Sequence, residues 1–442
     1  MRALRHAIGS FETDRRGNVA IIFALALLPV MSAVGCTVDY SRAVQLRSKL
    51  LAAADAASVG SIAKTSPAFV AAGKMTSDGA IAAGVTDATN IFNANMASVT
   101  DYTLNNVTPT VTKSGSTVTS VVTFSATLPT MFLGLVGKSA LTVAGSSTST
   151  ANMPLYIDFY LLLDNSPSMG VAATPADVTK MVANTSDKCA FACHDYNDSN
   201  NYYNLAKTLG VTTRIDVLRS ATQSLMDTAA ASQTYSNQFR MAIYDFGASS
   251  KTIGLRALFA LSSSLSSAKT AAGNIDLMGV YGNNDSYTAD KDTQFSTIFP
   301  AITTTISTSG TGTSSSPMKY LFFVSDGVAD EYNTACLKPK ASGSRCQSPL
   351  DPALCNTLKK NNVKIAVLYT TYLQLPTNSW YMSWIDPFNQ GPFGPSVNSE
   401  VATNMESCAS PGLYFEVSPT DGITDAMNAL FQKAVADARI SN

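Results

Sequence analysis

The feature that most constrains the fold is an apolar run that ends abruptly in polar side chains. Residues 156–163 read YIDFYLLL, and the next five residues read DNSPS. The run is too hydrophobic for a strand with one face in water. It is typical of a buried parallel strand, whose carboxyl end lies at the ligand-binding edge of an open α/β sheet. The sequence therefore predicts one carboxylate and two hydroxyls on a single turn at that edge.

These oxygen-bearing side chains suit a hard divalent cation. Asp164, Ser166 and Ser168 offer only oxygen ligands, which Mg²⁺, Ca²⁺ and Mn²⁺ prefer and which zinc and copper do not. A second apolar strand, 319–324, runs into a Ser-Asp-Gly turn and would bring Asp326 to the same edge. The alternative is a polar turn without a metal, and the second acidic loop argues against it.

The Asp-x-Ser-x-Ser spacing resembles the metal-ion-dependent adhesion site of von Willebrand factor type A domains. The resemblance implies that Ser166 and Ser168 touch the metal directly, together with a threonine from a third loop. It also implies that Asp164 and Asp326 act largely through bound water. One coordination position would stay open for a carboxylate of a partner. The expected cofactor is therefore Mg²⁺, with Ca²⁺ or Mn²⁺ as alternatives.

Two threonines are candidates for the third hydroxyl ligand. Thr293 precedes an apolar, helix-like segment, as the threonine of that family does, and is the preferred candidate. The family often has glycines before this threonine, whereas this chain has Lys291 and Asp292. Thr313, in a glycine-rich loop, is the alternative.

Size, charge and histidine content exclude several classes of protein. At 442 residues the chain is too long for one ordinary domain. A net charge of −1, without a Lys/Arg cluster beyond the extreme N-terminus, argues against nucleic-acid binding. The two histidines, His6 and His194, exclude a catalytic histidine pair and a three-histidine zinc site. A Ser-His-Asp triad would have to use His194, which lies in a loop-like segment.

An uncharged apolar segment, residues 17–38, has the length that a helix needs to cross a bilayer. The arginines before it favour a cytoplasmic N-terminus, so the rest of the chain would lie outside the bacterial inner membrane. A cleaved signal peptide is the alternative. Residues 38–57 and the Arg-Gly-Asn that opens the segment resemble the N-terminal part of TadE/TadG-like proteins of the tight-adherence (Flp) pilus machinery. That resemblance implies a role in pilus assembly.

The fold class predicted after the anchor is α/β. Apolar strands separated by helical segments indicate a doubly wound parallel sheet, which agrees with a von Willebrand factor A-like domain carrying two insertions. Before it lies a small pilin-like α+β region with an Ala-rich helical stalk. The predicted organisation is a cytoplasmic N-terminus (1–16), a transmembrane helix (17–38), the stalk and β region (39–152) and the A-like domain (153–442).

Six cysteines follow the membrane segment, an even number that suggests three disulfides in an oxidising compartment. Of fifteen possible connectivities, the predicted pairs are Cys189–Cys193, Cys336–Cys346 and Cys355–Cys408. A zinc site made of Cys189, Cys193 and His194 is the competing interpretation. It lacks a fourth ligand nearby and the usual spacing.

These features favour a membrane-anchored interaction protein outside the cytoplasm rather than an enzyme. The expected partner is a protein, a pilus or assembly component that offers an acidic residue. One alternative is a structural pilin-like component with a vestigial metal loop. The other is a metal-assisted hydrolase using Asp164 and Asp326. A hydrolase usually needs a positioned general base, and neither a spare histidine nor an obvious glutamate accompanies the metal loops, although Asp330 and Glu331 lie near in sequence.

Overall fold

The structure is a computed structural model, and its chain forms two compact units, Met1–Met153 and Pro154–Asn442. The residues that the structure describes are 17–75, 77–191, 194–235, 237–282, 286–333, 345–372, 374–389, 399–418 and 422–440.

The first unit is built on one long helix, α2 (Gly17–Gly60). Its N-terminal part is apolar and exposed, and it is the one helix in the described residues that is long and apolar enough to cross a membrane. Further along, Leu46, Leu50, Ala53 and Ala57 recur at helical spacing and are buried. The same helix therefore changes from an all-apolar segment to an amphipathic one that packs in a core.

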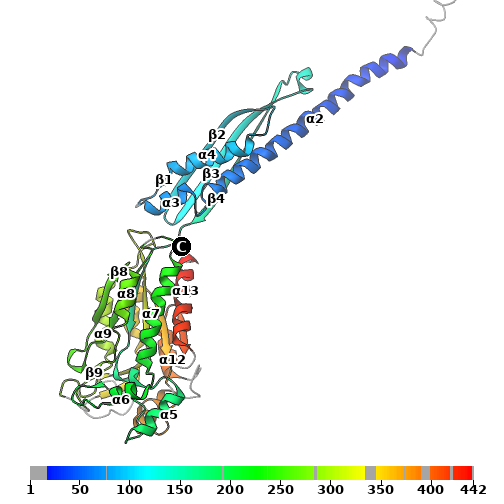
Figure 1. Cartoon of the computed structure of the whole chain (residues 1–442). Coiled ribbons are helices and arrows are strands. Elements are labelled where there is room, and N and C mark those ends of the chain that lie inside the picture. Colours follow the sequence, from blue (N-terminus) through cyan, green and yellow to red (C-terminus); the bar gives the residue numbers. More distant parts are fainter. Residues whose placement is uncertain are drawn as a thin grey trace, which may run out of the picture. The chain divides into compact units, whose positions relative to one another are not determined.

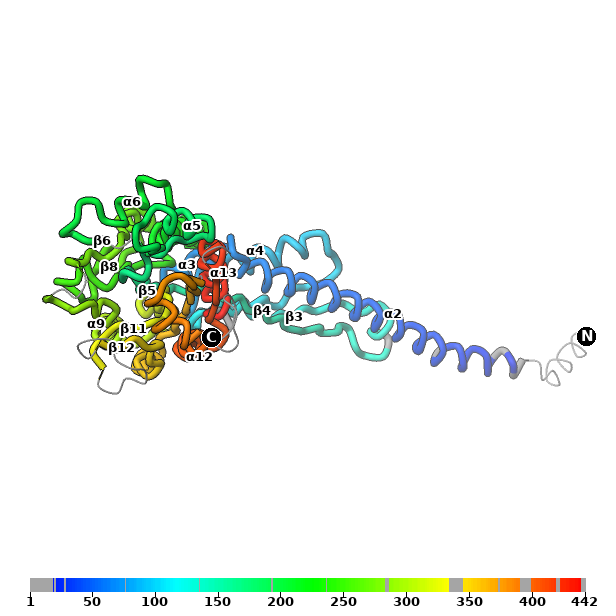
Figure 2. Tube along the Cα trace, turned by 90° about the horizontal axis from the view of Figure 1, so that it is seen from below, coloured from blue at the N-terminus to red at the C-terminus, as the bar shows by residue number. Residues whose placement is uncertain are grey.

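That core lies between α2 and a four-stranded antiparallel sheet in the order β1-β2-β3-β4. Figures 1 and 2 show α2 running beside β3 and β4. In β3, Val118, Val122 and Phe124 are among the alternate residues that face the core, as expected for a strand with one buried face. The elements of this unit other than α2 are α3 (Pro67–Lys74), β1 (Gly79–Ala80), α4 (Ala82–Met96), β2 (Thr103–Ser114), β3 (Thr117–Pro129), η1 (Leu133–Val136) and β4 (Ala140–Asn152).

A six-stranded sheet lies at the centre of the second unit. Its first five strands are mutually parallel, and β8 pairs antiparallel with β7 at one edge. The strand order is β14 (Tyr414–Val417), β13 (Lys364–Thr370), β10 (Met318–Ser325), β5 (Ile157–Leu163), β7 (Phe239–Asp245) and β8 (Arg256–Ser262). The antiparallel edge strand β8 departs from the all-parallel sheet that the sequence predicts.

Helices cover both faces of this sheet, which explains why β5 lacks polar alternation. Phe159, Leu161 and Leu163 pack in the core under one set of helices, and Tyr160 and Leu162 in the core under the other. The first set is α7 (Arg214–Ser232), α8 (Leu265–Ala272) and α13 (Ile423–Ile440); the second is α9 (Phe295–Thr305), α10 (Asn356–Lys360) and α12 (Glu400–Cys408). Helices α7 and α13 lie side by side in Figure 1.

Shorter elements complete the second unit. They are the helices α5 (Pro175–Asn184), α6 (Tyr202–Leu209) and α11 (Ser379–Trp384), the 3-10 turns η2 (Pro167–Gly170), η3 (Ser250–Thr252), η4 (Pro352–Cys355) and η5 (Asp386–Phe388), and the strand pairs β6 (His194–Asp195) with β9 (Gly279–Val280) and β11 (Val328–Tyr332) with β12 (Arg345–Pro349).

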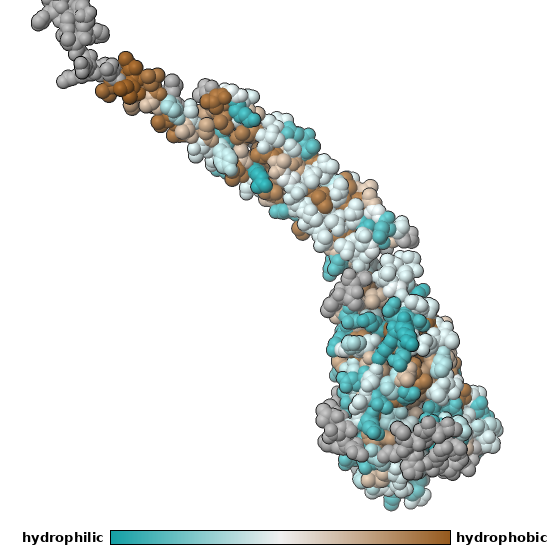
Figure 3. Space-filling view, turned by 180° about the vertical axis from the view of Figure 1, so that it is seen from behind, coloured by the Kyte–Doolittle hydropathy of each residue, from teal (hydrophilic) through white to brown (hydrophobic). Residues whose placement is uncertain are grey.

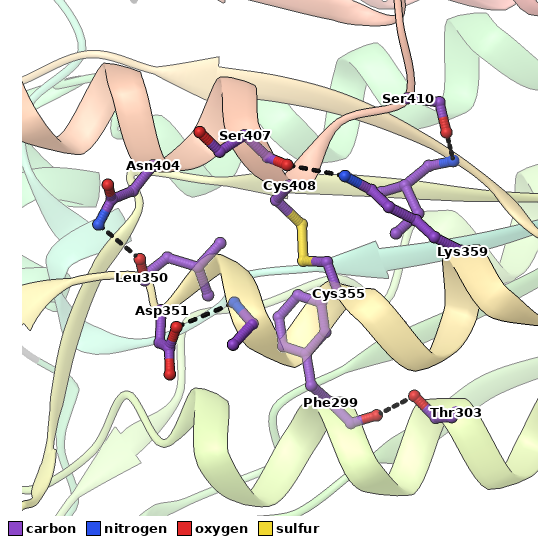
Figure 4. Close-up of a disulfide and its surroundings, with 12 residues drawn as sticks. Phe299, Thr303, Leu350, Asp351, Cys355, Lys359, Asn404, Ser407, Cys408 and Ser410 are labelled. Carbon is purple, nitrogen blue, oxygen red and sulfur yellow. Dashed lines mark hydrogen bonds between the residues drawn. A yellow bond between two sulfur atoms is a disulfide. The ribbon is translucent and has the colours of Figure 1, made fainter.

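One disulfide joins two described cysteines. Cys355 and Cys408, with Cα atoms 5.5 Å apart, link η4 to α12, as Figure 4 shows. Next to the bond, Lys359 Nζ donates a hydrogen bond to the carbonyl of Ser407 (2.7 Å). This is the predicted long-range pair. Cys346 is also disulfide-bonded, whereas Cys336, its predicted partner, lies outside the described residues.

The structure records Cys189 as a free cysteine, and the predicted pair Cys189–Cys193 stays a prediction. Its Sγ is turned onto its own chain and accepts a hydrogen bond from the backbone N–H of Phe191 (3.4 Å). Its carbonyl accepts a second bond, from the hydroxyl of Thr185 (3.0 Å). Cys193 itself lies outside the described residues.

Candidate metal centre

The two acidic loops meet because their strands are neighbours in the sheet. Strands β5 and β10 pair in parallel with Leu163 opposite Val324, so both end at the same edge. The backbone N–H of Asp164 continues the ladder to the carbonyl of Val324 (2.9 Å). Beyond it, the hydroxyl of Ser325 donates a hydrogen bond to Asp164 Oδ2 (2.6 Å). The Asp164 and Asp326 loops are therefore joined directly.

The turn after β5 is ordered by its own polar groups. Asp164 Oδ1 accepts a hydrogen bond from the N–H of Ser166 (2.9 Å), and the hydroxyls of Ser166 and Ser168 are 3.1 Å apart. Asp164 and Ser166 are both fully buried. One carboxylate and two hydroxyls thus lie together on one tight turn.

Asn165 positions this turn, and the sequence analysis gave it no role. Its amide nitrogen donates to the carbonyl of Gly247 (2.9 Å), and its amide oxygen accepts from the N–H of Phe246 (3.1 Å). Both partners belong to the loop after β7, the next strand in the sheet. The turn is therefore fastened to its neighbour on the side away from Asp326.

A buried arginine is the second residue that sequence reasoning missed. Arg214, the first residue of α7, is only 1% exposed, and its Nη1 lies 3.2 Å from Asp326 Oδ2. Its Nη2 donates to the hydroxyl of Thr370 (2.7 Å), and its guanidinium lies 4.8 Å from the ring centre of Tyr372. The only signal in the sequence was an arginine next to the apolar face of an amphipathic helix.

The buried charges at this centre do not balance. Burial first, and then the charge of Asp326, raise the pKa of Asp164 to about 7, although hydrogen bonds from Ser166 and Ser325 oppose the shift. Both carboxylates are fully buried, and Arg214 is the cation that contacts Asp326. Two ionised carboxylates beside one guanidinium leave one negative charge without a counter-charge, which a bound cation would neutralise.

The donor set fits a hard divalent cation. It consists of carboxylate and hydroxyl oxygens from Asp164, Ser166, Ser168 and Asp326, the ligand type that Mg²⁺, Ca²⁺ and Mn²⁺ prefer. Across the described residues there is no group of three or more His, Cys, Asp or Glu arranged to hold a metal. Any metal bound at this turn would therefore depend on the serine hydroxyls.

A cavity of about 460 Å³ adjoins the turn and includes the preferred threonine. Thr293 is 4% exposed, and its backbone is held by a pair of hydrogen bonds with Asp330 (3.2 and 2.9 Å). Thr293 and Ser168 line this cavity together, as does Tyr372. Its charged lining residues are Asp195, Asp290, Asp292, Asp330 and Arg345.

The alternative threonine lies at the other edge of the sheet. The carbonyl of Gly312, next to Thr313, accepts a hydrogen bond from the N–H of Tyr156, just before β5 begins. Asp164 follows the opposite end of the same strand. Thr313 is thus separated from the acidic loops by the length of β5, whereas Thr293 lines the cavity beside them.

We expect the stability of the cation-free protein to fall as the pH rises from about 5 to about 8. The pKa of Asp164 in the folded chain, about 7, is above its ordinary value of 3.8. The protonated carboxyl therefore contributes stability that is complete below pH 3.8 and is lost as the pH rises through about 7. This corresponds to a loss of about 2–3 kcal/mol in the free energy of unfolding between pH 5 and pH 8.

Thermal unfolding in EDTA and in millimolar Mg²⁺ measures this effect. Burial also raises the pKa of Asp245 and of Asp330, so these carboxyl groups contribute to the same pH dependence of stability. Comparison with the Asp164→Asn chain isolates the contribution of Asp164. In EDTA, the stability of the Asp164→Asn chain should depend less steeply on pH than that of the parent. Mg²⁺ should reduce the pH dependence of the parent but not that of the variant. Equal pH dependence of stability in parent and variant would contradict the assignment of this effect to Asp164.

Comparison with known families finds a match in the N-terminal segment. Residues 17–61 match the model of the family described as putative Flp pilus-assembly TadE/G-like. This segment corresponds to helix α2. No curated protein matches the chain.

Solved structures with weak similarity to this chain include two pilus proteins and a mussel byssus protein. The PilB minor pilin from Streptococcus sanguinis is 10% identical, with a TM-score of 0.35 and coverage of 76% of this chain and 79% of that one. The vWF domain of the type V pili tip protein Mfa5 from Porphyromonas gingivalis is 10% identical, with a TM-score of 0.35 and coverage of 65% and 97%. Proximal thread matrix protein 1 from the mussel byssus is 11% identical, with a TM-score of 0.30 and coverage of 63% and 46%. TM-scores below 0.5 do not establish a shared fold, so the architecture rests on the strand order of the six-stranded sheet.

Proposed function

We propose that this chain is a membrane-anchored, extracytoplasmic component of pilus assembly, and that its second unit binds a carboxylate of a protein partner through a divalent cation. The pilus role is supported by the family match of residues 17–61. Anchoring is supported by the apolar N-terminal part of α2, with the bacterial inner membrane as the expected location. The second unit would be a von Willebrand factor A-like domain.

One observation carries the binding proposal. Two acidic loops meet at one edge of the sheet with the carboxylates of Asp164 and Asp326 fully buried, and a cavity large enough for a side chain lies beside Ser168. Asp164, Ser166, Ser168, Thr293 and Asp326 would hold the cation. When bound, the cation would supply a positive charge to which a carboxylate of the partner can bind.

The charged residues of the cavity make this binding dependent on the cation. Four aspartates line it, and a single arginine opposes them. Arg345 is already paired with Asp330 and with Asp290. Without a cation, an acidic side chain entering the cavity would meet a net negative field. With the cation in place, the same field would favour partners that carry a basic residue next to the acidic one.

A second candidate function rests on the ion pair of Arg214 and Asp326 (3.2 Å). In this alternative the guanidinium takes the place of the metal, and the unit is a structural pilin-like component whose metal loop is vestigial. The two candidates differ in whether the protein takes up a divalent cation at all.

Calorimetric titration of the full chain in detergent with Mg²⁺, Ca²⁺ and Mn²⁺ separates them. We expect saturable uptake at millimolar concentration or below, and at least tenfold weaker binding after Asp164→Asn or the double substitution Ser166→Ala, Ser168→Ala. Asp227→Asn is the matched control, because its carboxylate is 62% exposed and pairs with Lys269. No uptake by the parent at millimolar concentration would favour the structural candidate and would refute the cation-dependent one.

A further inference from the structure

An exposed apolar loop lies beside the N-terminal helix in the first unit. Residues 130–139 connect β3 to β4 and contain η1. In this loop Met131 is 66% exposed, Val136 60% and Phe132 37%. Three large apolar side chains gathered on one short loop indicate a contact surface rather than scattered exposure.

The loop is fastened to α2 by a buried carboxylate. Asp39 is fully buried, and its two oxygens accept hydrogen bonds from the backbone N–H groups of Met131, Phe132 and Leu133, each 2.8 Å long. These N–H groups lie where η1 begins, so the carboxylate satisfies donors that the turn leaves unpaired. The loop is therefore held at a defined height along the helix.

A glycine brings the loop close to the helix one turn earlier. A Cβ added to Gly35 would lie 2.4 Å from Phe132 Cβ, which any larger residue would displace. Phe132 is thus packed directly on the apolar segment of α2. Figure 3 shows that apolar side chains gather along the N-terminal part of this unit.

The height of the loop coincides with the expected boundary of the bilayer. From Gly17 to Gly35 the helix rises about 27 Å, close to the ~30 Å of a hydrocarbon core. Polar and amphipathic side chains follow at once: Tyr40 is 69% exposed, and Arg42 reaches the carbonyl of Pro129 (3.4 Å). Lys138 on the loop is also exposed. Tyrosine, lysine and arginine are the residues that mark a membrane interface.

We propose that the loop 130–139 is a second membrane contact. Met131, Phe132 and Val136 enter the interfacial region of the leaflet in which residues 35–38 end, among the upper parts of phospholipid acyl chains. This contact depends on the proposed anchoring by residues 17–38, because the loop extends the apolar surface of that helical segment to one side. It would restrain the tilt of α2, since the helix then meets the bilayer at two places rather than one.

Fluorescence quenching by brominated lipids tests the contact. The full chain is reconstituted in phosphatidylcholine vesicles whose acyl chains carry bromine in their upper part, and single tryptophans are introduced by Met131→Trp, Phe23→Trp or Ser114→Trp. The two natural tryptophans give a background that is measured on the parent and subtracted. Ser114 is exposed at the far end of β2, on the hairpin opposite the loop, and serves as the control.

We expect the tryptophan at position 131 to be quenched at least about twofold more strongly than the one at position 114, because interfacial side chains lie within about 5–10 Å of the headgroup boundary. The tryptophan at position 23 reports the anchor itself. Quenching at position 23 but not at 131 would overturn the loop contact and leave the anchor intact, as expected if a second copy of the chain covered the loop instead. Absence of quenching at both positions would overturn the loop contact and the anchoring together.

Discussion

Arg214→Met is expected to lower the free energy of unfolding of the second unit by about 3–5 kcal/mol, the range measured when one partner of a buried ion pair is removed. Arg214 is 1% exposed and Asp326 is fully buried, with 3.2 Å between Nη1 and Oδ2. Methionine keeps much of the volume of arginine and removes its charge. The carboxylate of Asp326 would then lose the cation that contacts it.

Chemical denaturation of the full chain in EDTA measures this loss, and a double-mutant cycle assigns it. Asp326→Asn removes the charge that Arg214 neutralises, so the double substitution should be more stable than the sum of the two single effects predicts. Lys269→Met is the matched control, because this exposed pair with Asp227 should contribute less than about 1 kcal/mol. Additive effects in the cycle would show that Arg214 acts only through packing.

The Arg214→Met variant also tests whether the second unit binds a divalent cation. Arg214 and a divalent cation both compensate the charge of Asp326, so removal of the guanidinium should make the stability of the unit more dependent on Mg²⁺. We expect the Arg214→Met chain to regain part of its lost stability in millimolar Mg²⁺, whereas the parent gains less. A variant with no response to Mg²⁺ would favour the structural alternative.

Removal of the Cys355–Cys408 disulfide is expected to lower the stability of the second unit by about 4 kcal/mol, from the entropy of the open loop in the unfolded chain. The bond closes a sequence separation of 53 residues and is fully buried at both cysteines. The loop includes strand β13, which lies next to β10 in the sheet. Loss of the disulfide should therefore destabilise the part of the sheet that supports the Asp326 loop.

Denaturation of the Cys355→Ala, Cys408→Ala chain against the parent measures this effect under non-reducing conditions. Cys189→Ala is the matched control, since Cys189 is a free cysteine and closes no loop. Its substitution should change stability by much less. Equal stability of the parent and the double variant would mean that the bond adds strain that offsets the entropy.

Much of the second unit could be predicted from local sequence. The apolar runs that form β5, β10 and β13 are continuous because both faces of these strands are buried, and burial on both faces leaves a pattern that can be read residue by residue. The DNSPS turn and the Asp326 loop follow these strands directly. The exposed apolar start of α2 is local in the same way, because its length and composition alone indicate a membrane span.

Other features were decided only by tertiary structure. The sequence favours Thr293 but leaves Thr313 open as a ligand, and only the fold shows which edge of the sheet each loop reaches. Arg214 reaches Asp326 across 112 residues of chain, and no local pattern pairs them. Hydrophobic periodicity determined where strands and helices form, since it depends on neighbours a few residues apart. Strand order and the packing of distant loops determined which polar groups meet, since these contacts join residues that are remote along the chain.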